Sequence, residues 1–313
     1  MSRQEEIKQL VLDTRIVAII RGFASDTCLR LAEACGGEIV SCDSMQIYRG
    51  LPIGTAQPDV AELARAPHHL IAELDIHEPY DANRFVQRAK RVLDDISARG
   101  KTAFLVGGTG LYARSLIYGF ELLPADPAVF KALEAELAAE GGREKLLERL
   151  EAYGDAIPED VRLNPRRLLR ACEVLSLTGK PPWVQAKKFD KPDPSFRQFC
   201  LIPVLSMLKE RIRRRTARML ENGWLEEAEW ADSQGLLQTP TARQALGYAE
   251  VIDYLRHGLK GGLPKLCEIL TNRTVQYARR QLTWFKHQHP GAQLIEIERE
   301  EGAVEKILSS IHN

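Results

Sequence analysis

Strand-like and helix-like patterns alternate along the first third of the chain, and this alternation constrains the fold most. Apolar runs typical of buried strands cover Ile16–Ile20, Glu38–Ser41 and 102–106. Between the last two, residues 83–99 carry apolar side chains at the spacing of an amphipathic helix. Such alternation predicts an α/β fold, with a parallel sheet covered by helices and ligands beyond the carboxyl ends of the strands.

A different pattern begins near residue 119. Helical patterns replace the alternation, and residues 180–194 carry four prolines and four lysines, which predicts a loop. We therefore expect an α/β core made of residues 1–118 and 198–313, interrupted by a helical insertion domain at 119–197. Within these parts we predict helices at 127–140, 143–153, 165–178, 208–222, 225–234, 241–255 and 263–287, and a strand at 198–204.

The composition shows no overall excess of charge that would point to a charged partner. The 43 basic residues balance the 43 acidic ones, so any nucleic-acid surface must be local. The N-terminal residues are polar, no apolar run is long enough to span a membrane, and the six cysteines form no C-x-x-C pair. We expect a cytoplasmic protein with reduced thiols, no membrane association and no metal site built from cysteine or histidine pairs.

The loop after the first strand lacks the residues that a phosphate-binding loop at this position needs. A phosphate-binding loop between a strand and a helix needs glycines, then a Lys for the phosphates, then a Ser or Thr for the metal ion. Here Asp26 stands at the glycine position, Thr27 at the Lys position and Cys28 at the hydroxyl position. The strand–loop–helix frame is kept, while the groups that bind phosphate are missing.

Polar residues follow the other two strands. Asp43 comes directly after the second strand and could be a general base or a metal ligand, or it could cap the next turn. Thr109 lies in the glycine-rich run 107–112 after the third strand, where its hydroxyl could bond a phosphate or a base, or the run could be a tight turn. Both alternatives stay open from the residues alone.

Arginines gather in three helical segments. They lie at 166–170, 211–218 and 273–280, and on a helix such rows form either a phosphate-binding face or an ordinary solvated face. Three rows in a neutral protein favour a local anionic partner.

Several motifs occur in the order of one family. The run Asp43-Ser44-Met45-Gln46-Ile47-Tyr48, the segments 53–58 and 67–70, the run 107–112, the helix with Arg166, and the run Ala278-Arg279-Arg280-Gln281 resemble the tRNA dimethylallyltransferases. The resemblance covers nearly the whole chain. It implies a P-loop-type core with a helical insertion, and transfer of a dimethylallyl group from dimethylallyl diphosphate, with Mg²⁺, to the adenosine next to the tRNA anticodon, which is flipped out of its stack.

The resemblance also assigns residues. It implies that Asp43 is the general base and that Thr109 is a hydroxyl partner near the reacting centre. The residues expected to contact the anticodon stem-loop are Asp43, Ser44, Met45, Gln46, Arg166, Arg167, Arg170, Arg213, Arg214, Arg279, Arg280 and Gln281.

The departures from the family fall on its donor-diphosphate site. They comprise Gly22, Phe23, Ala24, Ser25, Asp26, Thr27 and Cys28, of which only Ala24-Ser25 matches, together with Ala249 and Val275 in place of basic residues. The sequence therefore predicts a monomeric tRNA-binding member with prenyl transfer lost or strongly impaired.

The alternative is an active enzyme with a rebuilt donor site that uses Lys187, Lys188 or the arginines of 211–218, with dimethylallyl diphosphate and Mg²⁺ bound there. A small-molecule phosphotransferase is disfavoured by the same missing Lys.

Overall fold

The computed structural model describes residues 16–20, 25–119, 123–185 and 191–297, together with 302, 304, 306 and 307. The chain divides into two compact units. We call Met1–Gly119 with Lys191–Asn313 the core unit, and Phe120–Asp190 the helical unit.

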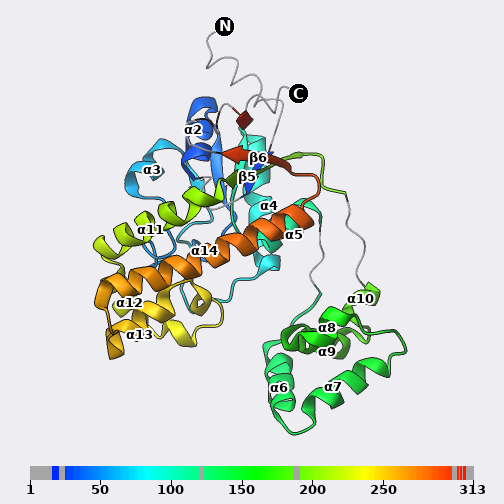
Figure 1. Cartoon of the computed structure of the whole chain (residues 1–313). Helices are drawn as coiled ribbons and strands as arrows, with labels where there is room; N and C mark the ends of the chain where they lie inside the picture. Colours follow the sequence, from blue (N-terminus) through cyan, green and yellow to red (C-terminus); the bar gives the residue numbers. More distant parts are fainter. Residues whose placement is uncertain are drawn as a thin grey trace. The chain divides into compact units, whose positions relative to one another are not determined.

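The described part of the core unit contains a sheet of six parallel strands in the order β3-β2-β4-β1-β5-β6 (Figure 1). The strands are β1 (Ile16–Ile20), β2 (Glu38–Ser41), β3 (His68–His69), β4 (Ala103–Gly107), β5 (Phe196–Pro203) and β6 (Gln293–Ile297). The predicted α/β class is confirmed. The two strands that the sequence patterns did not predict, β3 and β6, are the two edges of the sheet.

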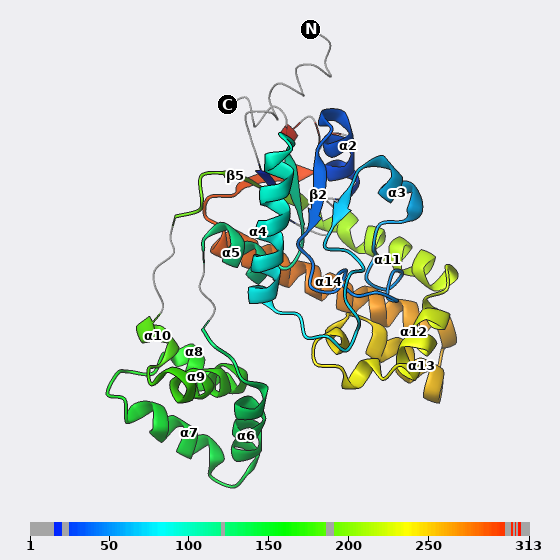
Figure 2. The same ribbon diagram turned by 180° about the vertical axis from the view of Figure 1, so that it is seen from behind.

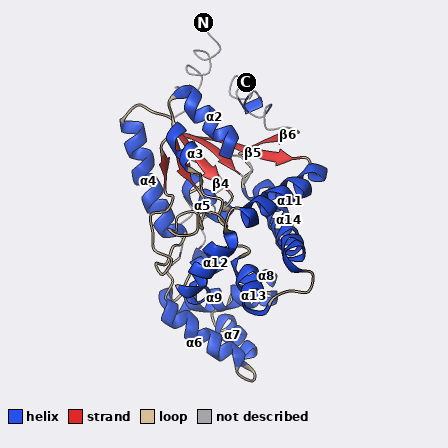
Figure 3. Ribbon diagram, turned by 90° about the vertical axis from the view of Figure 1, so that its left-hand side faces the viewer, coloured by secondary structure: helices blue, strands red, loops and turns tan. Residues whose placement is uncertain are grey.

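Helices accompany this sheet. In the core unit they are α2 (Ser25–Cys35), α3 (Val60–Arg65), α4 (Ala82–Ala98), α5 (Gly110–Ile117), α11 (Leu205–Glu221), α12 (Trp224–Ser233), α13 (Tyr248–His257) and α14 (Gly262–Gln288). α4 packs on β2 and β4 (Figure 2), and α11 runs alongside α14 (Figures 1 and 3).

One predicted helix was wrong at its start. Residues 241–255 do not form a continuous helix, because Gly247 adopts a φ of 93° that a helix interior excludes. A 3₁₀ turn at Ala242–Gln244 precedes this break, and α13 begins after it.

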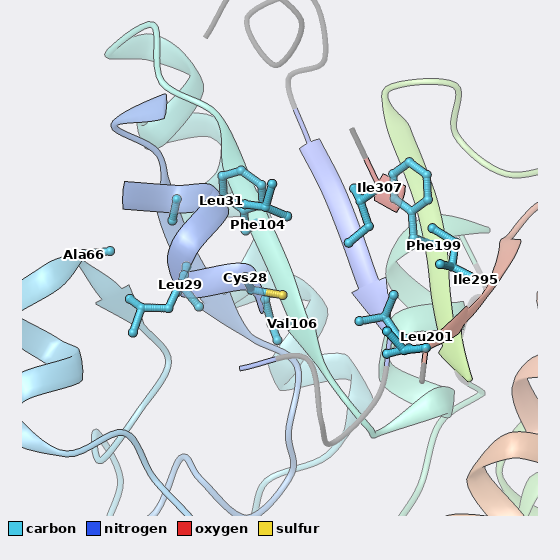
Figure 4. Packing of buried hydrophobic residues seen from close by; sticks show 13 residues of the cluster. Cys28, Leu29, Leu31, Ala66, Phe104, Val106, Phe199, Leu201, Ile295 and Ile307 are labelled. Carbon is cyan, nitrogen blue, oxygen red and sulfur yellow. The ribbon is translucent and has the colours of Figure 1, made fainter. Parts of the chain in front are cut away.

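Apolar side chains from α2 and the sheet form a hydrophobic cluster in the core unit (Figure 4). Leu31 and Cys28 of α2 pack with Phe104 and Val106 of β4 and Leu201 of β5, all nearly inaccessible to solvent. Burying a large apolar side chain contributes roughly 1.5–3 kcal/mol, so this cluster holds α2 firmly on the sheet.

The helical unit has a separate core. Its helices are α6 (Pro127–Ala138), α7 (Gly142–Glu151), α8 (Glu159–Leu163), α9 (Pro165–Thr178) and α10 (Pro182–Gln185). The Asn164 side chain caps α9 by accepting hydrogen bonds from the N–H groups of Arg166 and Arg167, and Gly179 ends it with a φ of 73°. The short helix α10 lies inside the stretch predicted to be only a loop.

Within the described residues, no helix has the length and apolar character needed to cross a membrane.

Candidate functional site

The turn after β2 is fixed by its own acidic residue. Asp43 Oδ1 accepts hydrogen bonds from the backbone N–H groups of Met45 (2.8 Å) and Gln46 (3.2 Å), as the capping alternative predicted. Burial raises the pKa of Asp43 above its ordinary value, while these two N–H groups and the charge of Arg215 oppose the shift. A desolvated carboxylate of this kind is a better proton acceptor than an exposed one.

The end of β4 lies directly against this turn. A Cβ on Gly107 would come 2.2 Å from the carbonyl oxygen of Cys42, so only glycine allows the two strand ends to approach this closely. Thr109 Oγ1 accepts a hydrogen bond from the Ser44 N–H (3.0 Å), and the Thr109 N–H donates to the Cys42 carbonyl (3.2 Å). The Thr109 hydroxyl therefore holds the residue next to Asp43, and its assignment to the reacting centre stays a prediction.

A second loop, residues 51–57, is held against the turn by glutamine side chains. Gln46 Nε2 donates to the Ala56 carbonyl (2.7 Å), and Gln46 Oε1 accepts from the Ser41 hydroxyl (2.9 Å). Gln57 Nε2 donates to the carbonyls of Gln46 (2.9 Å) and Tyr48 (2.7 Å). Gln46, predicted to contact tRNA, thus uses both ends of its amide within the protein.

These segments surround a cavity of about 420 Å³ in the core unit. Its walls come from the turn 43–46, the loop residues 54–56, the end of β4 at 106–108, and facing side chains of α11 and α14. This volume is in the range of small-ligand pockets. Gln281 of α14 closes one side, since its Nε2 donates to the Gly108 carbonyl (2.7 Å).

Two guanidinium groups line the same cavity as Asp43. Burial, followed by the charges of Arg211 and Arg218, lowers the pKa of Arg215 below its ordinary value. The Arg280 guanidinium lies 5.9 Å from the centre of the Tyr277 ring. Burial and the nearby Asp43 charge raise the pKa of Tyr277 to about 12, so its phenol stays neutral.

The sequence prediction did not single out Arg215, Tyr277 or the cavity face of α11. The signal was present, because Ile212, Arg215 and Met219 follow helical spacing and all line the cavity. The prediction selected Arg213 and Arg214 instead. Both are exposed and bond Glu210, at 2.8–2.9 Å.

The predicted arginines of the helical unit have different surroundings. Arg170 donates to the carbonyls of Leu123 (2.6 Å) and Pro124 (2.9 Å) and pairs with Glu173 (2.6 Å), so it fastens the incoming chain to α9. Arg167 pairs with Asp160, and Arg166 is exposed. Arg279 is likewise exposed, on α14. Whether they contact tRNA stays a prediction.

Among the predicted donor-diphosphate positions, those whose side chains the structure describes do not line the cavity. Gly22, Phe23 and Ala24 lie outside the described residues, and Ser25 and Asp26 begin α2. Thr27 and Cys28 are 1% and 0% exposed. Ala249 is exposed on α13, and Val275 packs against Leu208 and Ile212. Sequence reasoning treated these positions as facing one ligand, whereas the described side chains among them do not line the cavity.

A parallel sheet with a cavity lined by a carboxylate and two guanidinium groups is the arrangement of an α/β protein with a candidate ligand-binding site. The family model for IPP transferase matches residues 46–288. The chain belongs to this family, the tRNA dimethylallyltransferases.

The relatives cover most of the chain. The tRNA dimethylallyltransferase of Thermus thermophilus is 42% identical over 273 residues, spanning 84% of this chain and 85% of that protein. That of Deinococcus radiodurans is 39% identical over 266 residues, spanning 83% and 85%.

Solved structures agree with the fold. The tRNA isopentenylpyrophosphate transferase of Bacillus halodurans superposes with a TM-score of 0.67 at 31% identity, covering 96% of both chains. A eukaryotic dimethylallyltransferase acting on tRNA, at 23% identity, supports the fold alone, with a TM-score of 0.73 over 94% of this chain and 76% of that one.

Proposed function

We propose that the protein binds the anticodon arm of tRNA, receives the adenosine next to the anticodon beside Asp43, and has lost, or nearly lost, prenyl transfer from dimethylallyl diphosphate. The observation that carries this proposal is the burial of Thr27 and Cys28. By the resemblance these positions would hold the Lys and the hydroxyl of the donor cradle. Cys28 instead packs with Phe104 and Val106 in the apolar core.

The cost of this change is large. Each charge-assisted hydrogen bond to a phosphate contributes roughly 1.5–3 kcal/mol. Losing a Lys and a basic residue at 249 removes about 3–6 kcal/mol, which corresponds to a loss in donor affinity of more than a hundredfold. The same groups would stabilise the departing diphosphate, so the rate falls as well.

The residues described at the start of α2 do not fit a Mg²⁺–diphosphate pair. Mg²⁺ takes oxygen ligands, and the position that should supply a hydroxyl holds a buried thiol.

The acceptor side supports RNA binding. Proteins that act on a stacked base extrude it into a pocket and read it by hydrogen bonds and stacking. The cavity has a volume suited to a small ligand, and Asp43, Arg280 and Tyr277 line it. The relatives are named for action on tRNA.

Two measurements on the purified protein test the proposal. Fluorescence anisotropy with a labelled anticodon stem-loop RNA is expected to show saturable binding that weakens as salt rises. Calorimetry with dimethylallyl diphosphate and Mg²⁺ is expected to show no binding at millimolar donor. Prenylation of tRNA at the turnover of the relatives would overturn the proposal.

An active enzyme with a rebuilt donor site is the second candidate. The observation in its favour is that Arg215 and Arg280 line the cavity with Asp43, where they could bind a diphosphate. Lys187 and Lys188, the other candidate cations, lie outside the described residues. This candidate predicts tight Mg²⁺-dependent donor binding that falls at least tenfold in Arg215→Gln; absence of binding in the parent protein rejects it.

A further inference from the structure

A carboxylate on α12 holds the backbone of the loop 51–57. Glu227 Oε2 accepts the N–H of Ile53 (2.7 Å), and Oε1 accepts the N–H of Gly54 (2.8 Å). The phenol of Tyr248 also donates to Oε1. One side chain thus collects three donors from a loop and a helix far apart in the sequence.

The three donors require a carboxylate. Burial and the Glu227 charge raise the pKa of Tyr248 far above its ordinary value, so this phenol keeps its proton and donates. An amide offers only one acceptor oxygen, and its NH₂ group would face another donor. Glutamine at 227 would therefore leave a loop N–H or the phenol without a partner.

The loop has no room to move toward the helices. A Cβ on Gly54 would come 2.2 Å from Trp224 Nε1 and 2.6 Å from the Tyr248 ring. Ala56, two residues on, has a φ of 53°, which is uncommon for a residue with a side chain. The Gln46 amide holds this conformation through the Ala56 carbonyl.

The same loop forms a wall of the cavity. Gly54, Thr55 and Ala56 line it together with side chains of α14. From Glu227 a continuous series of hydrogen bonds runs through the loop to the Gln46 amide, and from the Gln46 N–H to Asp43 Oδ1. The position of this wall relative to Asp43 thus depends on Glu227 as well as on Gln46.

We propose that Glu227 is a positioning residue that fixes the cavity wall at 54–56 and thereby controls insertion of the extruded base, without contributing to the phosphate affinity of the protein. The inference rests on the proposed tRNA binding. It separates two quantities: overall RNA affinity, set by exposed cations, and accommodation of the base, set by the wall.

The test compares Glu227→Gln with Glu226→Gln, a neutralisation of the adjacent exposed glutamate, which makes no hydrogen bond to the loop. Two anticodon stem-loop RNAs are used. One carries 2-aminopurine in place of the target adenosine, and the other has no base there. We expect Glu227→Gln to weaken binding of the first RNA about tenfold and to reduce its 2-aminopurine fluorescence change. Binding of the abasic RNA, and its salt dependence, should stay within twofold of the parent.

Other outcomes would overturn the inference alone or the proposed function with it. Equal weakening of both RNAs would show a general structural defect, and unchanged binding of the first RNA would show that the wall does not need Glu227; either overturns the inference. Parent protein that binds neither RNA overturns the proposed function, and the inference with it. If Glu227→Gln does not fold, Tyr248→Phe takes its place, since it removes one donor to Glu227 and keeps the ring. This variant must bind the first RNA at least twofold more weakly than the parent, although by less than tenfold, and must bind the abasic RNA as the parent does.

Discussion

The turn after β2 and the start of α2 both follow strands of the same sheet, yet their side chains are used in opposite ways. At the turn, Asp43 and Ser44 are tied by hydrogen bonds and line a cavity. At the start of α2, Thr27 and Cys28 are buried, and Cys28 belongs to the apolar core. The turn after β2 presents polar groups to the cavity, whereas the described side chains at the start of α2 pack the helix against the sheet.

Under the proposed function, the loss of the donor site lies at the start of α2 and not at the turn of Asp43. The side chains of Thr27 and Cys28 are buried, so they cannot themselves contact a charged ligand in solvent. The donor side can therefore be lost without disturbing the acceptor side, because the hydrogen bonds of the 43–46 turn involve residues outside α2.

The largest expected effect tests whether position 27 can hold a cation. Thr27→Lys places an ammonium group at a site that is 1% exposed, so we expect a loss of roughly 3–5 kcal/mol in the free energy of unfolding. Thr27→Val is the matched control. The Thr27 hydroxyl has no hydrogen-bond partner among the described residues, so valine should be neutral or stabilise by about 0.5–1 kcal/mol. Urea denaturation measures both.

A stable Thr27→Lys variant that gained binding of inorganic diphosphate would remove the contrast between the two strand ends. That result would mean that one restored positive charge is enough for the donor cradle to bind diphosphate.

Sequence patterns predicted the centre of the fold better than its margins. β1, β2 and β4 come from short apolar runs, the pattern that predicts a buried strand, and β2 and β4 are buried. The edge strand β3 has two residues, too few to show a period, and residues 241–255 looked helical because periodicity does not register the backbone break at Gly247.

The same limit applies to the site. Asp43 and Gln281 were predicted because they belong to short motifs. Arg215 was not, because in a row of arginines the sequence does not show which ones face the cavity and which face solvent. Only the packing of α11 on α14 makes that distinction.

The second prediction compares Arg280, an exposed cation that lines the cavity, with Arg213, an exposed cation that does not. Arg280 lines the cavity and has no ion pair with a described acidic residue, so Arg280→Ala should weaken anticodon stem-loop binding about tenfold. Arg213 shares Glu210 with Arg214, and the two guanidinium groups lower the pKa of Glu210 to about 2. Because Glu210 already partners it, Arg213→Ala should cost less than threefold.

Anisotropy titrations at several salt concentrations measure both variants. Each variant should lower the slope of log affinity against log salt by no more than the amount expected for about one phosphate contact. A larger loss in Arg213→Ala than in Arg280→Ala would show that RNA binds along the outer face of α11 and not at the cavity.

The smallest effect concerns the charge of Asp43. Burial raises the pKa of this carboxyl above its ordinary value of 3.8, so the folded protein favours the protonated form more than the unfolded chain does. The resulting stabilisation is complete below the unfolded pKa and is lost as the pH rises through the folded pKa. At pH 7 the ionised carboxylate is thus a cost to stability, which a binding or catalytic site can retain for function.

Asp43→Asn removes this cost and keeps an oxygen that can accept the N–H groups of Met45 and Gln46. We expect the variant to be more stable than the parent at pH 7 by roughly 1 kcal/mol, and the difference to vanish near pH 3.8 and below. Denaturation at several pH values measures it, with Asp59→Asn as an exposed control. A variant less stable than the parent at pH 7 would mean that the charge of Arg215 fully offsets the penalty of burying the Asp43 carboxylate. The ionised carboxylate would then not lower the stability of the protein without a ligand.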